Sequence, residues 1–240
     1  MIKRVFLMNP PSELYRRDDR CQSRVDDQTV RVVFPPIELG ILAAIARQEG
    51  AEVVLKDYPT VQATAETYIA DLQAFRPDLI LLNTTAHTIR EDLAAFSVAR
   101  EFLPDVRTIV KGEAVAVQAE EVLRNHLELD MVIDGEAEDV FRELLQERDP
   151  ASINGLIWRA SDRSVVRNPE RSKLVEFDKL PLPARDLMDH DLYRSPENGR
   201  RITAIYAQRG CPSKCIYCPA GSMFGYKVRE RAPEQVVEEI

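Results

Sequence analysis

The 240-residue sequence lacks any apolar run approaching the roughly 20 residues that a membrane-spanning helix needs. Its first four residues lead into a short apolar stretch, without the longer apolar region of a secretory signal. An excess of positive charge is also missing, because the formal net charge is -8 and no basic patch stands out. These absences argue against membrane and nucleic-acid partners, and they predict a cytoplasmic protein that acts on small molecules.

Cysteine is scarce, and three of the four cysteines fall within eight residues. This crowding does not suit a disulfide framework in a reducing compartment, and it favours a metal site. Internal repeats and low-complexity tracts are absent as well. The length therefore suits one or two ordinary globular domains.

Five short apolar runs in the first half predict buried parallel strands, at 5–8, 53–55, 79–82, 109–110 and 131–133. Between them, apolar residues recur every three or four positions in 65–75 and 89–102, which places each set on one helix face. Another helix is expected to begin at Pro35-Pro36, since proline is favoured in a first turn. This alternation predicts an α/β fold with a doubly wound, five-stranded parallel sheet.

In such a sheet, ligands bind beyond the carboxyl ends of the strands, so the loops that follow the five runs hold the candidate binding residues. The first of these loops extends from Asn9 to about Phe34, a length that indicates a functional segment. The candidates are Asn9, Asn83, Thr84, Thr85, Gly112, Glu113, Gly135 and Glu136. Several have an alternative role, because the asparagine and threonines also suit caps and turns, and Glu136 and Glu138 at a helix start would stabilise the helix dipole.

The second half changes character. Two short apolar segments at 156–159 and 165–166 flank a turn and predict a hairpin, and 180–183 predicts an extended linker. A strand is expected at 202–206, followed by the cysteine loop and a helix from Pro233. We therefore predict an α/β domain at 1–150, a hairpin and linker at 151–198 and the opening of a second domain at 199–240. One strand, one loop and one helix cannot form a core, so the chain is expected to stop inside that domain.

Cys211, Cys215 and Cys218 occur in the segment RGCPSKCIYCPAG. Thiolates are the soft ligands of iron–sulfur clusters, and three of them would leave one iron of a four-iron cluster open to a substrate or cofactor. A structural zinc site is one alternative, but its fourth ligand would have to come from a residue outside zinc-finger spacing: Cys21, His87, His126 or His190. Unligated buried cysteines are another, although small apolar residues would serve there without the liability to oxidation.

This loop resembles the signature of the radical S-adenosylmethionine superfamily, C-x3-C-x-aromatic-C, with Tyr217 at the aromatic position. The resemblance implies a 4Fe-4S cluster on the three cysteines, with S-adenosylmethionine chelated to its open iron. One-electron reduction by an external flavodoxin- or ferredoxin-type protein would then cleave the sulfonium to methionine and a 5'-deoxyadenosyl radical. The resemblance places Tyr217 against the adenine of S-adenosylmethionine; in the alternative, Tyr217 merely packs the loop.

The region before the cysteines is similar to the cobalamin-binding domain of one radical S-adenosylmethionine subclass. The likeness rests on N-P-P at 9–11, P-P-x-x-L-G at 35–40, the polar loop at 83–85, G-E-A-E at 135–138, and L-P-x-P-A-R-D-L at 180–187. It adds Pro10, Pro36, Leu39 and Gly40 to the expected cobalamin contacts. Two departures are evident: Lys111-Gly112-Glu113 replaces a loop with two glycines and a histidine, and the D-x-H-x-x-G motif is missing. We therefore predict that no histidine of that motif coordinates cobalt.

The resemblance implies that the parent protein is a cobalamin-dependent radical S-adenosylmethionine enzyme, a methylase or a cyclase of a small molecule. The substrate would mostly contact a barrel that this chain lacks. Two alternatives stay open. One is a non-catalytic cobalamin carrier or sensor with a vestigial cysteine loop, and the other is an α/β ligand-binding domain that binds no corrin.

Overall fold

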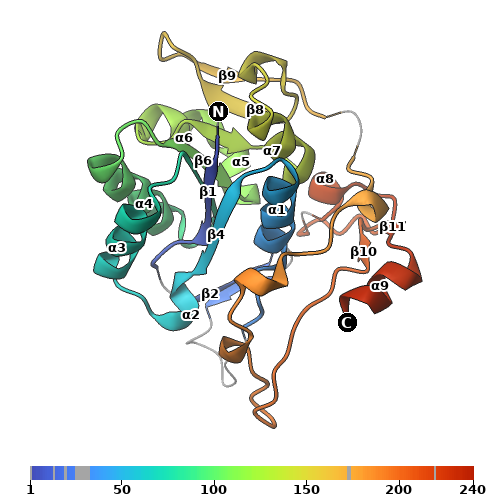
Figure 1. Ribbon diagram of the computed structural model, residues 1–240. Helices are drawn as coiled ribbons and strands as arrows, with labels where there is room; N and C mark the ends of the chain where they lie inside the picture. Colours follow the sequence, from blue (N-terminus) through green and yellow to red (C-terminus); the bar gives the residue numbers. More distant parts are fainter. Residues whose placement is uncertain (1, 13, 19–20, 25–32, 172–173, 219) are drawn as a thin grey trace.

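A seven-stranded sheet runs through the middle of the protein in the order β4-β1-β5-β6-β7-β8-β9 (Figure 1). The structure is a computed structural model that describes residues 2–12, 14–18, 21–24, 33–171, 174–218 and 220–240. The strands are β1 (Arg4–Asn9), β4 (Glu52–Asp57), β5 (Leu79–Asn83), β6 (Arg107–Lys111), β7 (Met131–Ile133), β8 (Leu156–Arg159) and β9 (Val165–Arg167). The first five in this order of the sheet are parallel, which confirms the predicted doubly wound sheet.

The predicted hairpin is present but does not stand apart from the sheet. Strand β8 pairs antiparallel with β7, and β9 pairs antiparallel with β8. The hairpin therefore extends the five parallel strands to seven, because the free edge of β7 offers unpaired backbone groups.

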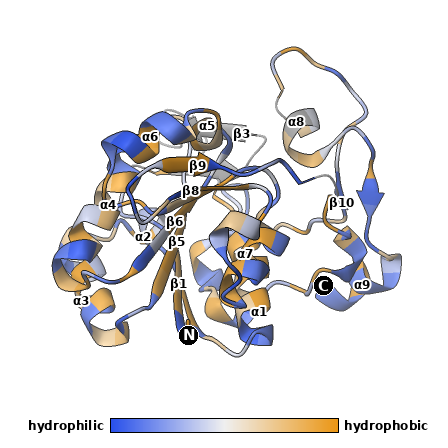
Figure 2. Cartoon of the chain, turned by 90° about the horizontal axis from the view of Figure 1, so that it is seen from above, coloured by the Kyte–Doolittle hydropathy of each residue, from blue (hydrophilic) through white to orange (hydrophobic). Residues whose placement is uncertain are grey.

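Helices cover both faces of the sheet (Figure 2). They are α1 (Ile37–Gln48), α2 (Tyr58–Val61), α3 (Ala65–Phe75), α4 (Ile89–Phe102), α5 (Glu113–Val117), α6 (Ala119–Asn125) and α7 (Ala137–Leu145), followed by α8 (Ala220–Phe224) and α9 (Pro233–Glu239). The helices predicted at 65–75, at 89–102 and from Pro233 are confirmed, and α1 begins directly after Pro36. None of the helices in the described ranges is long and apolar enough to span a bilayer.

Strand β1 shows how the two cores arise. Val5 and Leu7 point to the face covered by α1 and α7, whereas Phe6 and Met8 point to the face covered by α3 and α4. Side chains alternate between the faces of a strand, so a continuous apolar run fills both cores.

The linker after the hairpin packs on α1, on the same side as the C-terminal segment (Figure 2). The Ala184 amide donates to the Gly40 carbonyl oxygen at 2.9 Å. A Cβ at Gly40 would lie 2.3 Å from Met188 Cε and 3.1 Å from Pro183 Cβ. Glycine therefore lets the linker approach this helix closely.

Two sequence predictions need correction. The strand expected at 202–206 is wrong: among the described residues the strand that leads into the cysteine loop is the two-residue β10 (Gln208–Arg209), which pairs with β11 (Arg229–Glu230). An apolar run forms a strand only where a neighbouring strand pairs with it. Here the Ile202 amide donates to the Tyr193 carbonyl oxygen and the Ala204 carbonyl oxygen accepts from Arg185 instead. The loop expected from Asn9 to Phe34 contains a hairpin of β2 (Tyr15–Asp18) and β3 (Cys21–Arg24). Residues 13, 19–20 and 25–32 of that loop lie outside the described residues.

Replacing Phe96 with alanine should lower the free energy of unfolding by about 3–5 kcal/mol, because its ring is fully buried between α4 and the sheet. The same replacement at Phe102, which ends the same helix and is 38% exposed, should cost less than about 1 kcal/mol. Urea unfolding measures both values. Equal losses would contradict the packing of α4 described above.

Candidate functional site

The carboxyl ends of the parallel strands bring several predicted residues to one edge of the sheet. Asn9 at the end of β1 stands beside Asp57 at the end of β4, and Asn83 at the end of β5 stands beside Lys111 at the end of β6. The loops after β6 and β7, which hold Gly112 to Glu113 and Gly135 to Glu136, open at the same edge. The sheet thus gathers the residues predicted from the strand ends.

Asp57 organises one part of this edge. Its Oδ1 accepts a hydrogen bond from Asn9 Nδ2 at 2.9 Å, and its Oδ2 accepts from Thr60 Oγ1 at 2.7 Å and Tyr193 Oη at 2.9 Å. Burial and the neighbouring Asp57 carboxylate raise the pKa of Tyr193 well above its ordinary value, so this phenol stays a donor. Asn9 is only 5% exposed, and its Oδ1 has no hydrogen-bond partner within the described part of the chain.

Sequence reasoning missed Tyr193. It lies in a polar segment without helical or strand periodicity, 136 residues from Asp57, and no local signal marks it. Only the path of the linker along the sheet edge brings the two together.

The loop after β5 holds a compact polar network. Thr84 Oγ1 and Thr88 Oγ1 each donate to the buried Asp92 carboxylate at 2.7 Å, and Thr85 Oγ1 lies 2.9 Å from Thr88 Oγ1. Thr85 Oγ1 also accepts the backbone amides of His87 and Thr88 at 3.3 Å. The hydroxyls of Thr84 and Thr85, both predicted cobalamin contacts, therefore make hydrogen bonds at the start of α4. This is the alternative role, as turn residues, that the sequence predicted for them.

The loop after β6 contains a buried ion pair and a close backbone approach. The Lys111 ammonium pairs with the Glu38 carboxylate of α1. Gly112 has φ of +148°, and a Cβ there would lie 2.6 Å from the Thr84 carbonyl oxygen, so no larger residue fits. Glu113 follows at the start of α5, where partial burial raises the pKa of its carboxyl.

The remaining residues expected from the resemblance lie in different surroundings. Leu39 is fully buried in the core beneath α1, and Gly40 faces the linker. Pro10 is buried, Pro36 is half-buried and Gly135 is exposed. Of these, the two α1 residues contact protein rather than an open crevice.

Glu136 and Glu138 face two arginines from the C-terminal segment. Glu136 Oε1 lies 2.6 Å from Arg229 Nη2 and 3.4 Å from Arg209 Nη1, and Glu138 Oε1 lies 2.8 Å from Arg209 Nη1. Burial by itself lowers the pKa of the Arg209 guanidinium, but Glu138, Glu38 and Glu136 outweigh it and raise the pKa above its ordinary value. The arginine therefore stays charged in a nearly dry site.

The cysteine loop extends between β10 and β11, beyond these arginines. Cys211 is partly exposed, Cys215 and Cys218 are exposed, and all three are free thiols. Tyr217 is 86% exposed, so it does not pack the loop. Across the described residues, no three histidine, cysteine, aspartate or glutamate side chains lie close enough to hold a metal ion. The loop carries three thiols that could bind a cluster, but they would have to move closer together to do so.

The ends of this loop are fixed against each other. The Cys211 amide donates to the Gly225 carbonyl oxygen at 3.1 Å. Gly210 has φ of +99°, and a Cβ there would lie 2.2 Å from the Lys227 carbonyl oxygen. We call Arg209, Gly210, Cys211, Gly225, Lys227 and Arg229 the loop base.

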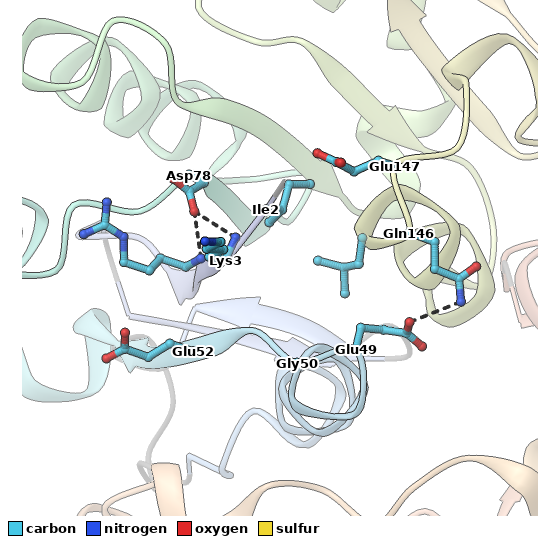
Figure 3. A pocket seen from close by; sticks show the side chains of 10 residues that line it. Ile2, Lys3, Glu49, Gly50, Glu52, Asp78, Gln146 and Glu147 are labelled. Carbon is cyan, nitrogen blue, oxygen red and sulfur yellow. Dashed lines mark hydrogen bonds between the residues drawn. The ribbon is translucent and has the colours of Figure 1, made fainter.

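A pocket of about 720 Å³ opens at the opposite, amino edge of the sheet (Figure 3). There Asp78 accepts the backbone amides of Lys3 and Arg4 at 2.8 Å each, and Glu49 accepts from Gln146 at 3.2 Å. Doubly wound sheets bind their ligands at the carboxyl edge, so this pocket is not the candidate site.

The polar groups of the carboxyl edge fit a corrin, and the thiols of the loop fit an iron–sulfur cluster. Asn9 Oδ1 offers a buried acceptor to an amide such as those around a corrin ring, since a buried acceptor without a partner is costly. Three unpaired thiols on a non-helical loop suit a cluster with one open iron. Together, the fold and these groups define a doubly wound ligand-binding domain joined to a three-cysteine loop.

Residues 24–145 match the B12 binding domain family, and the chain belongs to that family. It is similar to an uncharacterized methyltransferase of Pyrococcus horikoshii, with 26% identity over 100% of this chain and 50% of the relative. The chain thus spans about half the length of that relative.

Two solved structures share the fold. The cobalamin-dependent S-adenosylmethionine radical enzyme OxsB, solved with aqua-cobalamin and S-adenosylmethionine, matches with a TM-score of 0.73 and 20% identity, over 99% of this chain and 31% of that chain. The radical S-adenosylmethionine methyltransferase TsrM from Kitasatospora setae, solved with cobalamin and a [4Fe-4S] cluster, matches with a TM-score of 0.68 and 20% identity, over 100% of this chain and 45% of that chain. Both likenesses extend past the B12 binding domain into the cysteine segment.

Replacing Gly210 with alanine should open the loop base, because the new Cβ would collide with the backbone of Lys227. Hydrogen exchange at the Cys211 amide should accelerate by about tenfold or more, equivalent to a local loss of about 1.4 kcal/mol. Gly199→Ala is the matched control, since Gly199 also has a positive φ but no atom within 4 Å of its Cβ position. Equal exchange in the two variants would contradict the close approach.

Proposed function

We propose that the chain is the cofactor-binding part of a cobalamin-dependent radical S-adenosylmethionine enzyme that methylates a small molecule. The proposal depends on one observation: ion pairs join the cysteine loop to the carboxyl edge of the sheet. Arg209, two residues before Cys211, is held by Glu136 and Glu138 at the start of α7, which follows β7 at the carboxyl edge of the B12 binding domain. A cluster on this loop would therefore stand near the crevice where the family binds its corrin.

The relatives support this proposal. One is a methyltransferase by name, and both solved structures belong to radical S-adenosylmethionine enzymes that contain cobalamin. We further propose that 1–150 holds the corrin, that 199–240 holds the cluster, and that a flavodoxin- or ferredoxin-type protein supplies the electron.

The residues of this chain have distinct roles in the proposal. The proposed cluster ligands are Cys211, Cys215 and Cys218, and Tyr217 is free to lie against bound S-adenosylmethionine. The proposed contacts to cobalamin are Asn9, Pro10, Pro36, Asn83, Thr84, Thr85, Gly112, Glu113 and Gly135 at or near the carboxyl edge. When bound, the cluster supplies a reducing electron and the corrin supplies a carrier for a methyl group. The Asp57 network keeps Asn9 oriented for the corrin.

A second candidate is a cobalamin carrier or sensor. It is supported by the match of residues 24–145 to the B12 binding domain family, which lies wholly before the cysteine loop. In that case the chain would bind cobalamin without retaining iron.

Anaerobic reconstitution with iron and sulfide tests the cluster. The wild-type chain should retain roughly four irons after desalting, and Cys215→Ala should lose most of them, because two thiolates hold a cubane poorly. Cys21→Ala, outside the loop, should retain the wild-type iron content. Iron-free wild-type protein that still binds cobalamin would favour the carrier instead.

Replacing Asn9 with alanine should weaken hydroxocobalamin binding about five- to thirtyfold, since one buried hydrogen bond contributes about 1–2 kcal/mol. Asn125→Ala is the control, because Asn125 is exposed at the end of α6. Titration followed by corrin absorbance measures both dissociation constants. An unchanged value for Asn9→Ala would remove this residue from the site.

A further inference from the structure

The strands that flank the cysteine loop place two like charges opposite each other. Arg209 of β10 pairs directly with Arg229 of β11 in the antiparallel ladder. Like charges at opposed positions repel across a two-stranded ladder. Because β10 and β11 bracket residues 210–228, this repulsion acts at the two ends of the cysteine loop.

Glu136 lies between the two arginines and removes the repulsion. Its Oε1 contacts both guanidinium groups, and its Oε2 accepts from Arg229 Nη1 at 2.9 Å and from the Val175 amide at 2.8 Å. Glu138 adds a second carboxylate to Arg209, while Phe177 and Phe224 lie 4.9 and 5.3 Å from that guanidinium. The Arg209 group is thereby fixed from several sides.

Stability alone does not account for this arrangement. The side chains of Glu136 and Glu138 are 2% and 6% exposed, so their charges have lost most of their hydration. Replacing buried ion pairs with well-packed apolar residues is often neutral or stabilising. Glu138 Oε2 also has no hydrogen-bond partner among the residues that the structure describes. In some proteins such pairs instead fix the relative orientation of the groups that they join.

The orientation fixed here is that of the first cysteine. Arg209 precedes Cys211 by two residues, and the Cys211 amide is itself bonded across the loop base to Gly225. A displacement of Arg209 would therefore move Cys211 with it.

We propose that Glu136 and Glu138 are positioning residues, which hold the loop base through Arg209 and Arg229 so that Cys211 stands ready for cluster binding. This role gives Glu136 and Glu138 of the G-E-A-E motif at 135–138 a task at the base of the cysteine loop in place of a contact to the corrin, whereas Gly135 remains a proposed corrin contact. The identity of the cluster rests on the proposed function. The anchoring of the loop base by Glu136 and Glu138 does not depend on it.

The test compares Glu136→Gln, Glu138→Gln and Arg209→Lys with Glu143→Gln, a control on α7 that pairs with Arg171 instead. Hydrogen exchange at the Cys211 amide is measured without iron. Iron per chain, and the paramagnetic resonance spectrum of the reduced cluster with and without S-adenosylmethionine, are measured after anaerobic reconstitution. Cobalamin absorbance and the unfolding midpoint serve as checks of the α/β fold.

The expected result is at least fivefold faster exchange at Cys211 and at least a twofold loss of iron in Glu136→Gln, at wild-type cobalamin binding. The spectrum of any retained cluster should change, whereas Glu143→Gln should match the wild type. Arg209→Lys, which keeps the positive charge, should retain more iron than Glu136→Gln but less than the wild type. It can still be measured if the glutamine variants fail to fold.

Wild-type exchange in the glutamine variants would overturn the proposal, and so would faster exchange with unchanged iron and spectrum. If the wild-type chain itself retains no iron, the proposed function fails, and the exchange at Cys211 still decides whether these carboxylates hold the loop base.

Discussion

Two carboxylates at the start of α7 cannot stay buried without positive partners, and this constraint shapes the C-terminal part of the molecule. Glu136 and Glu138 follow shortly after β7, an inner strand of the sheet. Their partners Arg209 and Arg229 lie more than 70 residues later in the sequence. Removing one partner from a buried pair leaves an uncompensated charge. The C-terminal segment therefore has to dock on the face of α1 and α7, where the structure places it (Figure 2).

The same side of the protein carries a second set of contacts with that segment. The linker lies on α1 because Gly40 leaves room for it, and Tyr193 continues this path to Asp57 at the carboxyl edge. Ion pairs, apolar packing and one buried phenol thus act together. Their combined effect is to bring the cysteine loop and the carboxyl edge of the sheet, which are far apart in the sequence, to neighbouring positions.

Several features were predictable because they depend on local rules. Apolar runs of strand length identified the five parallel strands, and apolar residues at helical spacing identified the helices at 65–75 and 89–102, since burial requires such patterns. Residues at strand ends, such as Asn9 and Gly112, followed from the topology rule for parallel sheets. The expected strand at 202–206 failed because apolar character cannot supply the missing neighbour strand.

The sequence by itself determined the α/β class, the alternation of its five parallel strands with helices, and the spacing of the three thiols, because each of these depends on residues within a few positions of one another. Only the tertiary structure decided where Glu136, Glu138 and Tyr193 act, and that Gly40 faces the linker rather than a crevice. These contacts join residues separated by 70 to 150 positions, and such pairs leave no periodic or local signal in the chain. Their partners are selected by burial and charge in the assembled fold.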